Sequence, residues 1–146
     1  MFAAIVIADT PIVLRAGPDQ FIELSNIERF DDGSGYSSRL NVGSLGSGRF
    51  VCTGHPFYFD NLPSFAKDLA KAYDLVAGKA RLAHNYEKDF IEIEVLRGGR
   101  VSVTGFLVEH GPPHQELRFA FGCDQTFLPD LLRSFQQVAG ELERKS

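Results

Sequence analysis

A strand, a turn and a helix follow one another in the same order at two places in this chain, once in the middle and once near the C-terminus. The first copy starts at Arg49-Phe50-Val51-Cys52 and enters a helix at Leu62-Pro63. The second starts at Arg118-Phe119-Ala120-Phe121 and enters a helix at Leu128-Pro129. After each Leu-Pro pair, apolar residues recur about every 3.6 residues, which predicts two amphipathic helices. The matching positions are Phe65, Leu69, Ala72, Tyr73 and Val76 in the first helix and Leu131, Phe135, Val138, Ala139 and Leu142 in the second.

The rest of the chain alternates short apolar runs with turn residues, which is typical of β-strands. Phe21-Ile22-Glu23-Leu24 is one such run, and Ile91 to Val95 alternates with glutamates before the turn Arg97-Gly98-Gly99-Arg100. We predict an α+β fold with a mainly antiparallel sheet of about eight short strands and two amphipathic helices, built as two strand-meander-plus-helix halves. The helices should bury their large apolar residues, together with Leu128, against one antiparallel sheet.

Length and charge exclude several classes of protein. A chain of 146 residues can bury roughly two thirds of its unfolded surface, so we expect residues 1–146 to form a single α+β domain. The net charge of −4 and the scattered basic residues argue against nucleic-acid binding. No apolar run approaches the roughly 20 residues of a membrane span, and the apolar segment Phe2–Ala8 lacks a cationic start. We therefore expect a cytoplasmic protein, with Cys52 and Cys123 as free, semi-buried thiols and a disulfide as the alternative.

Four histidines test whether the chain carries a catalytic or metal site. They lie in or beside predicted loops and are His55, His84, His110 and His114. A hydrolase or metal site would bring two or three of them together with Asp60, Asp89 or Glu109. His110 and His114 can approach each other across a Gly-Pro-Pro turn, but no pair of histidines has the helical spacing of a metal site. We favour solvent-exposed loop histidines, and we predict no catalytic residue, no metal and no cofactor.

The sequence predicts a turn before the first helix, and this turn carries the aromatic run His55-Pro56-Phe57-Tyr58-Phe59. Core filling explains Phe57 and Phe59, whereas Tyr58 and His55 are expected to be exposed and to serve as an anchor for a protein partner. Tyr86 is a second exposed candidate. Asp31 and Asp32 lie in a loop that lacks the spacing of a calcium site and is explained by a turn between strands. The candidate partner-binding residues are His55, Tyr58, Tyr86, Asp31 and Asp32.

The C-terminal two thirds carry a helix around Phe65 to Val76, strands like Phe90 to Leu96, the element Gly99-Arg100-Val101-Ser102-Val103, and a closing strand and helix that start at Leu117. This layout, over roughly residues 49–142, resembles a group of small bacterial proteins of unknown function. The group includes immunity-type proteins encoded beside polymorphic toxins, among them the wall-associated-protein immunity type. Because the shared motifs are turn glycines and core positions, the resemblance implies a fold and, by analogy, a binding protein; it transfers no catalytic residue.

Three functions follow from these observations. The first is a non-enzymatic protein-binding module, such as an immunity protein that neutralises a cognate bacterial toxin; an acidic chain suits a basic, nucleic-acid-cleaving partner. The second is a small-ligand-binding protein or a hydrolase with a loop histidine site, in a pocket lined by His55, Tyr58 and His114. The third is a homo-oligomeric structural protein, for instance a homodimer that pairs through a free sheet edge at Phe21 to Leu24.

Overall fold

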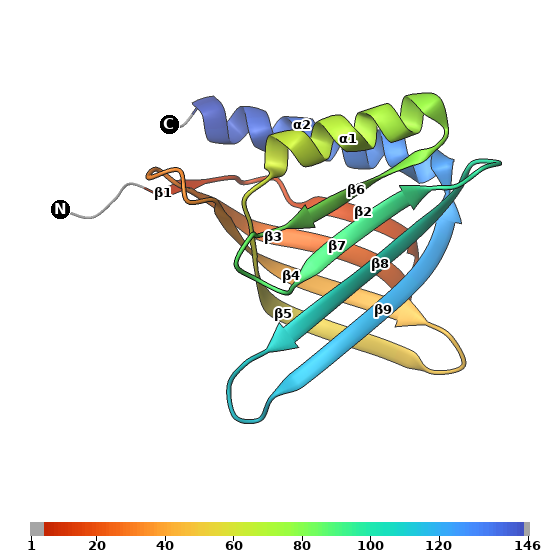
Figure 1. The fold of residues 1–146 in the computed structure, drawn as a ribbon, viewed down its shortest axis with the longest axis horizontal. Helices are drawn as coiled ribbons and strands as arrows, with labels where there is room; N and C mark the ends of the chain where they lie inside the picture. Colours follow the sequence, from red (N-terminus) through yellow and green to blue (C-terminus); the bar gives the residue numbers. More distant parts are fainter. Residues whose placement is uncertain (1–4, 145–146) are drawn as a thin grey trace.

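The computed structural model describes residues 5–144, which form nine strands, two α-helices and a short 3₁₀ turn (Figure 1). Residues 1–4 and 145–146 lie outside this range, and with them the first part of the apolar segment Phe2–Ala8. The strands are β1 (Ile5–Ile7), β2 (Ile12–Gly17), β3 (Gln20–Phe30), β4 (Tyr36–Leu45), β5 (Arg49–Phe59), β6 (Gly78–Ala83), β7 (Phe90–Val95), β8 (Arg100–Glu109) and β9 (Gln115–Asp124). The helices are α1 (Leu62–Leu75) and α2 (Leu128–Arg144), and the 3₁₀ turn η1 (Gln125–Phe127) precedes α2.

The strands form two antiparallel sheets, where the sequence predicted one. Sheet A has five strands. Their order is β1-β3-β4-β5, and β2 also pairs with β3, along a different stretch of β3 from β1. Sheet B is the meander β6-β7-β8-β9. Between β5 and β6 the chain makes a backbone hydrogen bond from Asp60 N to Ala83 O at 3.0 Å in place of a strand ladder, because α1 is inserted there. The predicted α+β class and its two strand-and-helix halves are confirmed.

The two sheets face each other, and their strands cross steeply in Figure 1, with both helices lying side by side above them. Helix α1 packs on β6 and β7, whereas α2 packs on β1 and β2. The rings of Phe65 and Phe135 join the helices, with centroids 4.8 Å apart. The large apolar helix positions that the sequence predicted are buried, and they are Phe65, Leu69, Leu128, Leu131, Phe135, Val138 and Leu142. One hydrophobic cluster contains residues from both sheets and both helices.

Val76 is the exception to this prediction. It has a positive φ of 52° and an exposed side chain, because it ends α1 in the left-handed conformation. Helix α1 therefore ends before Gly78, which starts β6. Asn61 precedes α1 but does not cap it: its side chain donates to Arg81 O at 2.7 Å and accepts from Ala83 N at 3.1 Å, so it ties the start of α1 to β6.

The N-terminal segment and the last helix are joined by polar contacts. Glu141 of α2 accepts hydrogen bonds from Asp9 N at 2.8 Å and from the Thr10 hydroxyl. Gln137 donates to the Thr10 hydroxyl at 3.0 Å. These contacts connect residues more than a hundred positions apart in sequence and hold α2 along the edge of sheet A.

Strand β5 contains the aromatic run that the sequence placed at a turn. The run forms extended strand. A bulge opposite Asn41 shifts the register between β4 and β5. At this bulge Asn41 Oδ1 accepts a hydrogen bond from Gly54 N at 2.7 Å, and Gly54 has a φ of +69°. Side chains alternate along a strand, so His55 shares the inner face with Phe57 and Phe59. The expected exposure of His55 is therefore wrong, and its side chain is buried.

Between residues 5 and 144, no helix combines the length and the apolar character that crossing a membrane requires.

Candidate partner-binding surface

Tyr58 points to the outer face of sheet A, where its side chain is 43% exposed. It lines a hollow of about 160 Å³ together with residues of the β3–β4 turn and of the β6–β7 loop, namely Phe30, Ser34, Tyr36, His84 and Glu87. The two loops approach closely, since His84 Nε2 lies 3.4 Å from Ser34 O. The structure thus brings Tyr58 together with the loops that carry the other exposed candidates. We define the Tyr58 surface as Asp31, Asp32, Ser34, Tyr58, His84, Tyr86 and Glu87.

Hydrogen bonds from backbone N–H groups to aspartate side chains hold both loops. Asp32 Oδ1 accepts from Ser34 N at 2.9 Å, which confirms the predicted turn. Hydrogen bonds from Ser34, that of its side chain first, hold the pKa of Asp32 below its usual value, so this carboxylate is charged at neutral pH. In the other loop, Asp60 Oδ2 accepts from Asn85 N at 3.2 Å, and the His84 and Tyr86 rings lie 5.7 Å apart. Tyr86 itself is 91% exposed.

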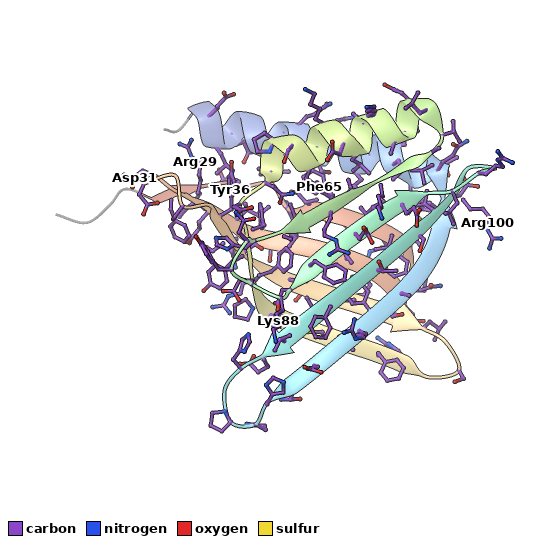
Figure 2. All side chains as sticks on the ribbon, in the orientation of Figure 1. Arg29, Asp31, Tyr36, Phe65, Lys88 and Arg100 are labelled. Atoms are coloured by element: carbon purple, nitrogen blue, oxygen red, sulfur yellow. The ribbon has the colours of Figure 1, made fainter. Side chains whose placement is uncertain are left out.

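Carboxylates outnumber cations on this end of the molecule. Asp31, Asp32 and Glu87 are exposed. The cations are the exposed Lys88 of the β6–β7 loop and the half-buried Arg29 of β3, which lies at the same end of the molecule as Asp31 in Figure 2. Figure 2 shows Asp31 at the left end of the molecule, with Lys88 further down and Arg100 at the opposite end. A second hollow of about 310 Å³ continues from Tyr58 across the outer face of sheet A. It is lined by Ile7, Asn26, Glu28, Ser37, Ser38, Arg39, Pro56 and Tyr58.

His55 makes a buried hydrogen bond with Asp89 instead of an exposed anchor. Its Nε2 lies 2.7 Å from Asp89 Oδ2, and Asp89 Oδ1 accepts from Val108 N at 3.1 Å. The pair therefore links β5 of sheet A to the β6–β7 loop and to β8 of sheet B. Both side chains are more than nine-tenths buried, which makes this a structural clamp between the sheets.

A groove separates the two sheets on the side away from the helices. It has a volume of about 370 Å³ and lies between the outermost strands β5 and β9. We call it the β5–β9 groove. Its lining consists of residues 51–56 of β5 together with Leu107, Glu109, Gln115, Glu116 and Leu117. Pro56 borders both this groove and the second hollow beside Tyr58, so the two surfaces are continuous along β5.

Cys52 lines this groove near the buried His55–Asp89 pair. Burial raises the pKa of the Cys52 thiol, and the negative charges of Asp89 and Glu109 raise it further. A cysteine nucleophile needs a lowered pKa, so this arrangement does not activate the thiol. Cys52 and Cys123 are free thiols, as the sequence predicted.

Two of the alternative arrangements expected from the sequence do not form. His55 and Tyr58 point to opposite faces of β5. His114 lies in the β8–β9 loop, where its Nε2 is 3.3 Å from Glu116 Oε1, so these three residues line no common pocket. The loop does bring the rings of His110 and His114 to 6.2 Å. Residues Phe21 to Leu24 belong to β3, which pairs with β2 on one side and β4 on the other, so the predicted free edge is wrong.

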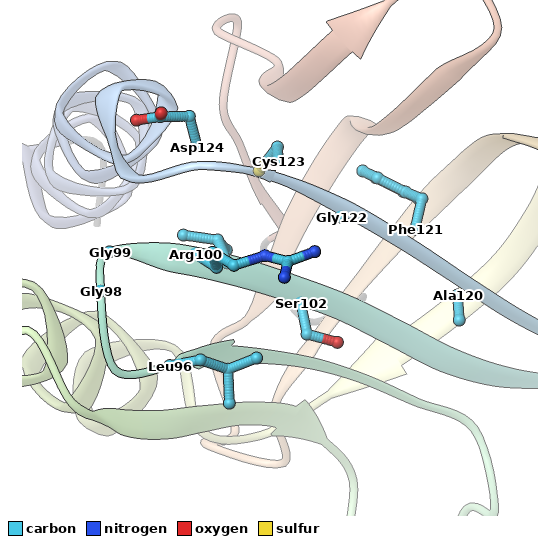
Figure 3. Close-up of a pocket in the computed structure, with 11 residues that line it drawn as sticks. Leu96, Gly98, Gly99, Arg100, Ser102, Ala120, Phe121, Gly122, Cys123 and Asp124 are labelled. Atoms are coloured by element: carbon cyan, nitrogen blue, oxygen red, sulfur yellow. The ribbon is translucent and has the colours of Figure 1, made fainter.

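A further hollow, of about 690 Å³, lies at the β7–β8 turn and the end of β9 (Figure 3). Its lining includes Gly98, Gly99 and Gly122, and the Arg100 side chain lies along the strand. Cys123 borders it, and burial raises the pKa of that thiol to about 11. In the part of the chain that the structure describes, no three His, Cys, Asp or Glu side chains converge as metal ligands would. That the protein binds no metal stays a prediction.

Sequence reasoning missed the β5–β9 groove, although the sequence contains a signal for it. Leu107 and Glu109 lie two residues apart on one face of β8, and Leu117 and Gln115 do the same on β9. The inner face of this hairpin thus changes from apolar to polar toward its tip, which indicates that no second sheet covers the tip.

The chain matches the Immunity protein WapI-like family over residues 16–142. Because this match covers most of the sequence, the chain belongs to the WapI-like immunity protein family. The match starts near the end of β2, so it includes β3 and β4 of sheet A, which the resemblance over roughly residues 49–142 left out. Neither a curated protein nor a solved structure matches the chain.

Proposed function

We propose that this chain is a non-enzymatic immunity protein that binds a cognate toxin through the Tyr58 surface and thereby neutralises it. Family membership supports the class of function. The observation that carries the choice of surface is the convergence of exposed tyrosines and carboxylates from three segments that are distant in sequence.

Tyr58 has the properties of an interface anchor. It projects from the end of β5, the outermost strand of sheet A, between two flanking residues whose side chains are fully buried, Phe57 and Phe59. A tyrosine held in this way loses little conformational entropy on binding, and it offers both a large ring and a hydroxyl group to a partner. Tyr86, on the neighbouring loop, can extend the contact.

The charge of the surface suits a basic partner. Asp31, Asp32 and Glu87 lie around the tyrosines, and the whole chain has a net charge of −4. A toxin that cleaves nucleic acid needs a basic surface to hold phosphates, and complementary potentials speed and orient such an encounter. Binding should therefore weaken as the salt concentration rises.

The chemistry around the histidines favours binding over catalysis. His55 and Asp89 are buried and occupied with each other and with Val108 N. The thiol of Cys52 has a raised pKa, which is opposite to what a nucleophile requires.

The test uses a toxin domain found in the reading frames that neighbour the gene for this chain, produced in an inactivated form. Truncating an interface anchor costs about 2 kcal/mol or more, so Tyr58→Ala should weaken binding roughly thirtyfold with little effect on the fold. Leu75→Ala is the matched control, because Leu75 is exposed at the far end of α1. Co-expression with the active toxin should protect cells less well with Tyr58→Ala than with the control. Equal affinities for both variants would exclude the Tyr58 surface, and a lack of any complex would refute the proposed function.

A further inference from the structure

We infer that the β5–β9 groove receives an extended, positively charged segment of the toxin. This inference rests on the proposed function, and it adds a second point of contact and the chemistry of the segment that occupies it.

The groove has the shape that an extended segment requires. Its wall on β5 is six residues long, from Val51 to Pro56, which corresponds to about 20 Å of strand. β5 and β9 are the outermost strands of their sheets, and exposed strand edges offer backbone hydrogen-bonding groups to an added strand. Pro56 has no N–H to donate, so such pairing involves the part of β5 that precedes it.

Apolar side chains of β5 remain accessible at one end of the groove, where Val51 belongs to the lining and Phe50 directly precedes it. Phe50 is paired with Ser44, whose hydroxyl contacts Ala120 O of sheet B at 3.1 Å, so Phe50 lies on the inner face of sheet A. It is nevertheless 60% exposed, and the adjacent Val51 is 54% exposed. An aromatic ring left open on an inner face is a site where a partner can bury apolar area.

The charges at the groove indicate the charge of the segment that binds there. Glu109 and Glu116 line its β8–β9 wall, and the Asp89 carboxylate lies close enough to raise the pKa of Cys52. The Arg39 guanidinium contacts Gly54 O at 3.3 Å, but Arg39 lies on the outer face of sheet A. A segment with lysine or arginine side chains therefore complements this rim.

The native cysteines provide a direct test. Cys52 lines the groove, whereas Cys123 borders the separate hollow in Figure 3 and serves as the internal reference. The complex with the inactivated toxin domain is treated with an alkylating reagent, and labelling of each cysteine is measured by mass spectrometry. We expect labelling of Cys52 to be lost in the complex while labelling of Cys123 is unchanged.

A charge variant gives the second test. Replacing Glu109→Gln together with Glu116→Gln should slow association and weaken binding about tenfold at low salt. The control with the same net charge is Asp68→Asn together with Glu94→Gln, because both residues are exposed outside the groove. Unprotected Cys52 and equal affinities for the two double variants would overturn the groove, and a loss of affinity in Tyr58→Ala would then still support the proposed function. If no complex forms at all, the proposed function fails and the groove inference fails with it.

Discussion

The space between the two sheets opens along two sides of the molecule, and the two sides differ in what covers them. Along one side α1 and α2 cover the gap (Figure 1), and the rings of Phe65 and Phe135 join the two helices there, with centroids 4.8 Å apart. Along the other side lies the β5–β9 groove, which has carboxylates on its rim, and Phe50, directly before its first lining residue, is 60% exposed. Burial of apolar area stabilises the fold on the first side, and on the second side the same kind of surface stays accessible. The first side contributes to stability, and we propose that the second contributes to recognition.

Removing a ring from the covered side should have the largest effect. Phe135→Ala deletes a side chain that is 2% exposed between both helices, and we expect it to lower the free energy of unfolding by about 3 to 5 kcal/mol through lost burial and a cavity. Urea denaturation measures this loss. A loss below about 1 kcal/mol would show that the helices do not fill the gap, and the contrast between the two sides would disappear.

Breaking the clamp beneath the groove should have the next largest effect. Asp89→Ala leaves His55 buried without its carboxylate and removes the acceptor of Val108 N. We expect the free energy of unfolding to fall by about 3 kcal/mol, because a buried partner is left unpaired. Asp68→Ala on the exposed face of α1 is the control and should change stability by less than about 0.5 kcal/mol. If both variants are equally stable, the pair does not hold the sheets together.

The thiols should report burial chemically. Because burial raises the pKa of Cys123 from its ordinary value of 9.0 to about 11, its thiolate fraction at pH 8 should be about a hundredfold lower than that of an exposed cysteine. Its alkylation rate should rise about tenfold for each pH unit until the pH approaches this pKa. Rates measured by mass spectrometry on the folded protein test this, and a rate like that of a free thiol at pH 8 would contradict the burial of Cys123.

The smallest expected change in stability belongs to the phenylalanine of the open side. Phe50→Ala should alter the free energy of unfolding by no more than about 0.5 kcal/mol, since the side chain is mostly exposed. Together with Phe135→Ala, this variant shows how much stability the same substitution removes on each of the two sides. A loss comparable to that of Phe135→Ala would mean that Phe50 is part of the core and that the groove is closed in solution.

Most of the architecture could be predicted because it depends on local periodicity. Alternation along Ile91 to Val95 and the 3.6-residue pattern around Phe135 each specify an element and its buried face without reference to the rest of the chain. The division into two sheets could not be predicted in this way. It depends on how α1 interrupts the pairing between β5 and β6, which is a property of the whole fold.

The candidate site was less predictable for the same reason. The exposure of Tyr58 follows from alternation and was expected, whereas its proximity to the loops around Asp32 and Tyr86 depends on tertiary structure. His55 was misplaced because the segment was assigned to a turn; as strand, residues 55, 57 and 59 share one face. The partner of His55, Asp89, lies 34 positions away and has no local signal.

The contacts between Glu141 and the segment Asp9–Thr10 have a consequence for synthesis of the chain. Helix α2 is made after all nine strands, and only then can it cover sheet A, so the apolar face of this sheet stays open while the chain is being translated. Such distant contacts also slow folding. Chains that end before Leu128 should therefore be digested rapidly by protease, whereas the full chain should resist. If the chain neutralises a toxin as we propose, protection should begin only after α2 has left the ribosome, which sets a minimum delay between translation and protection.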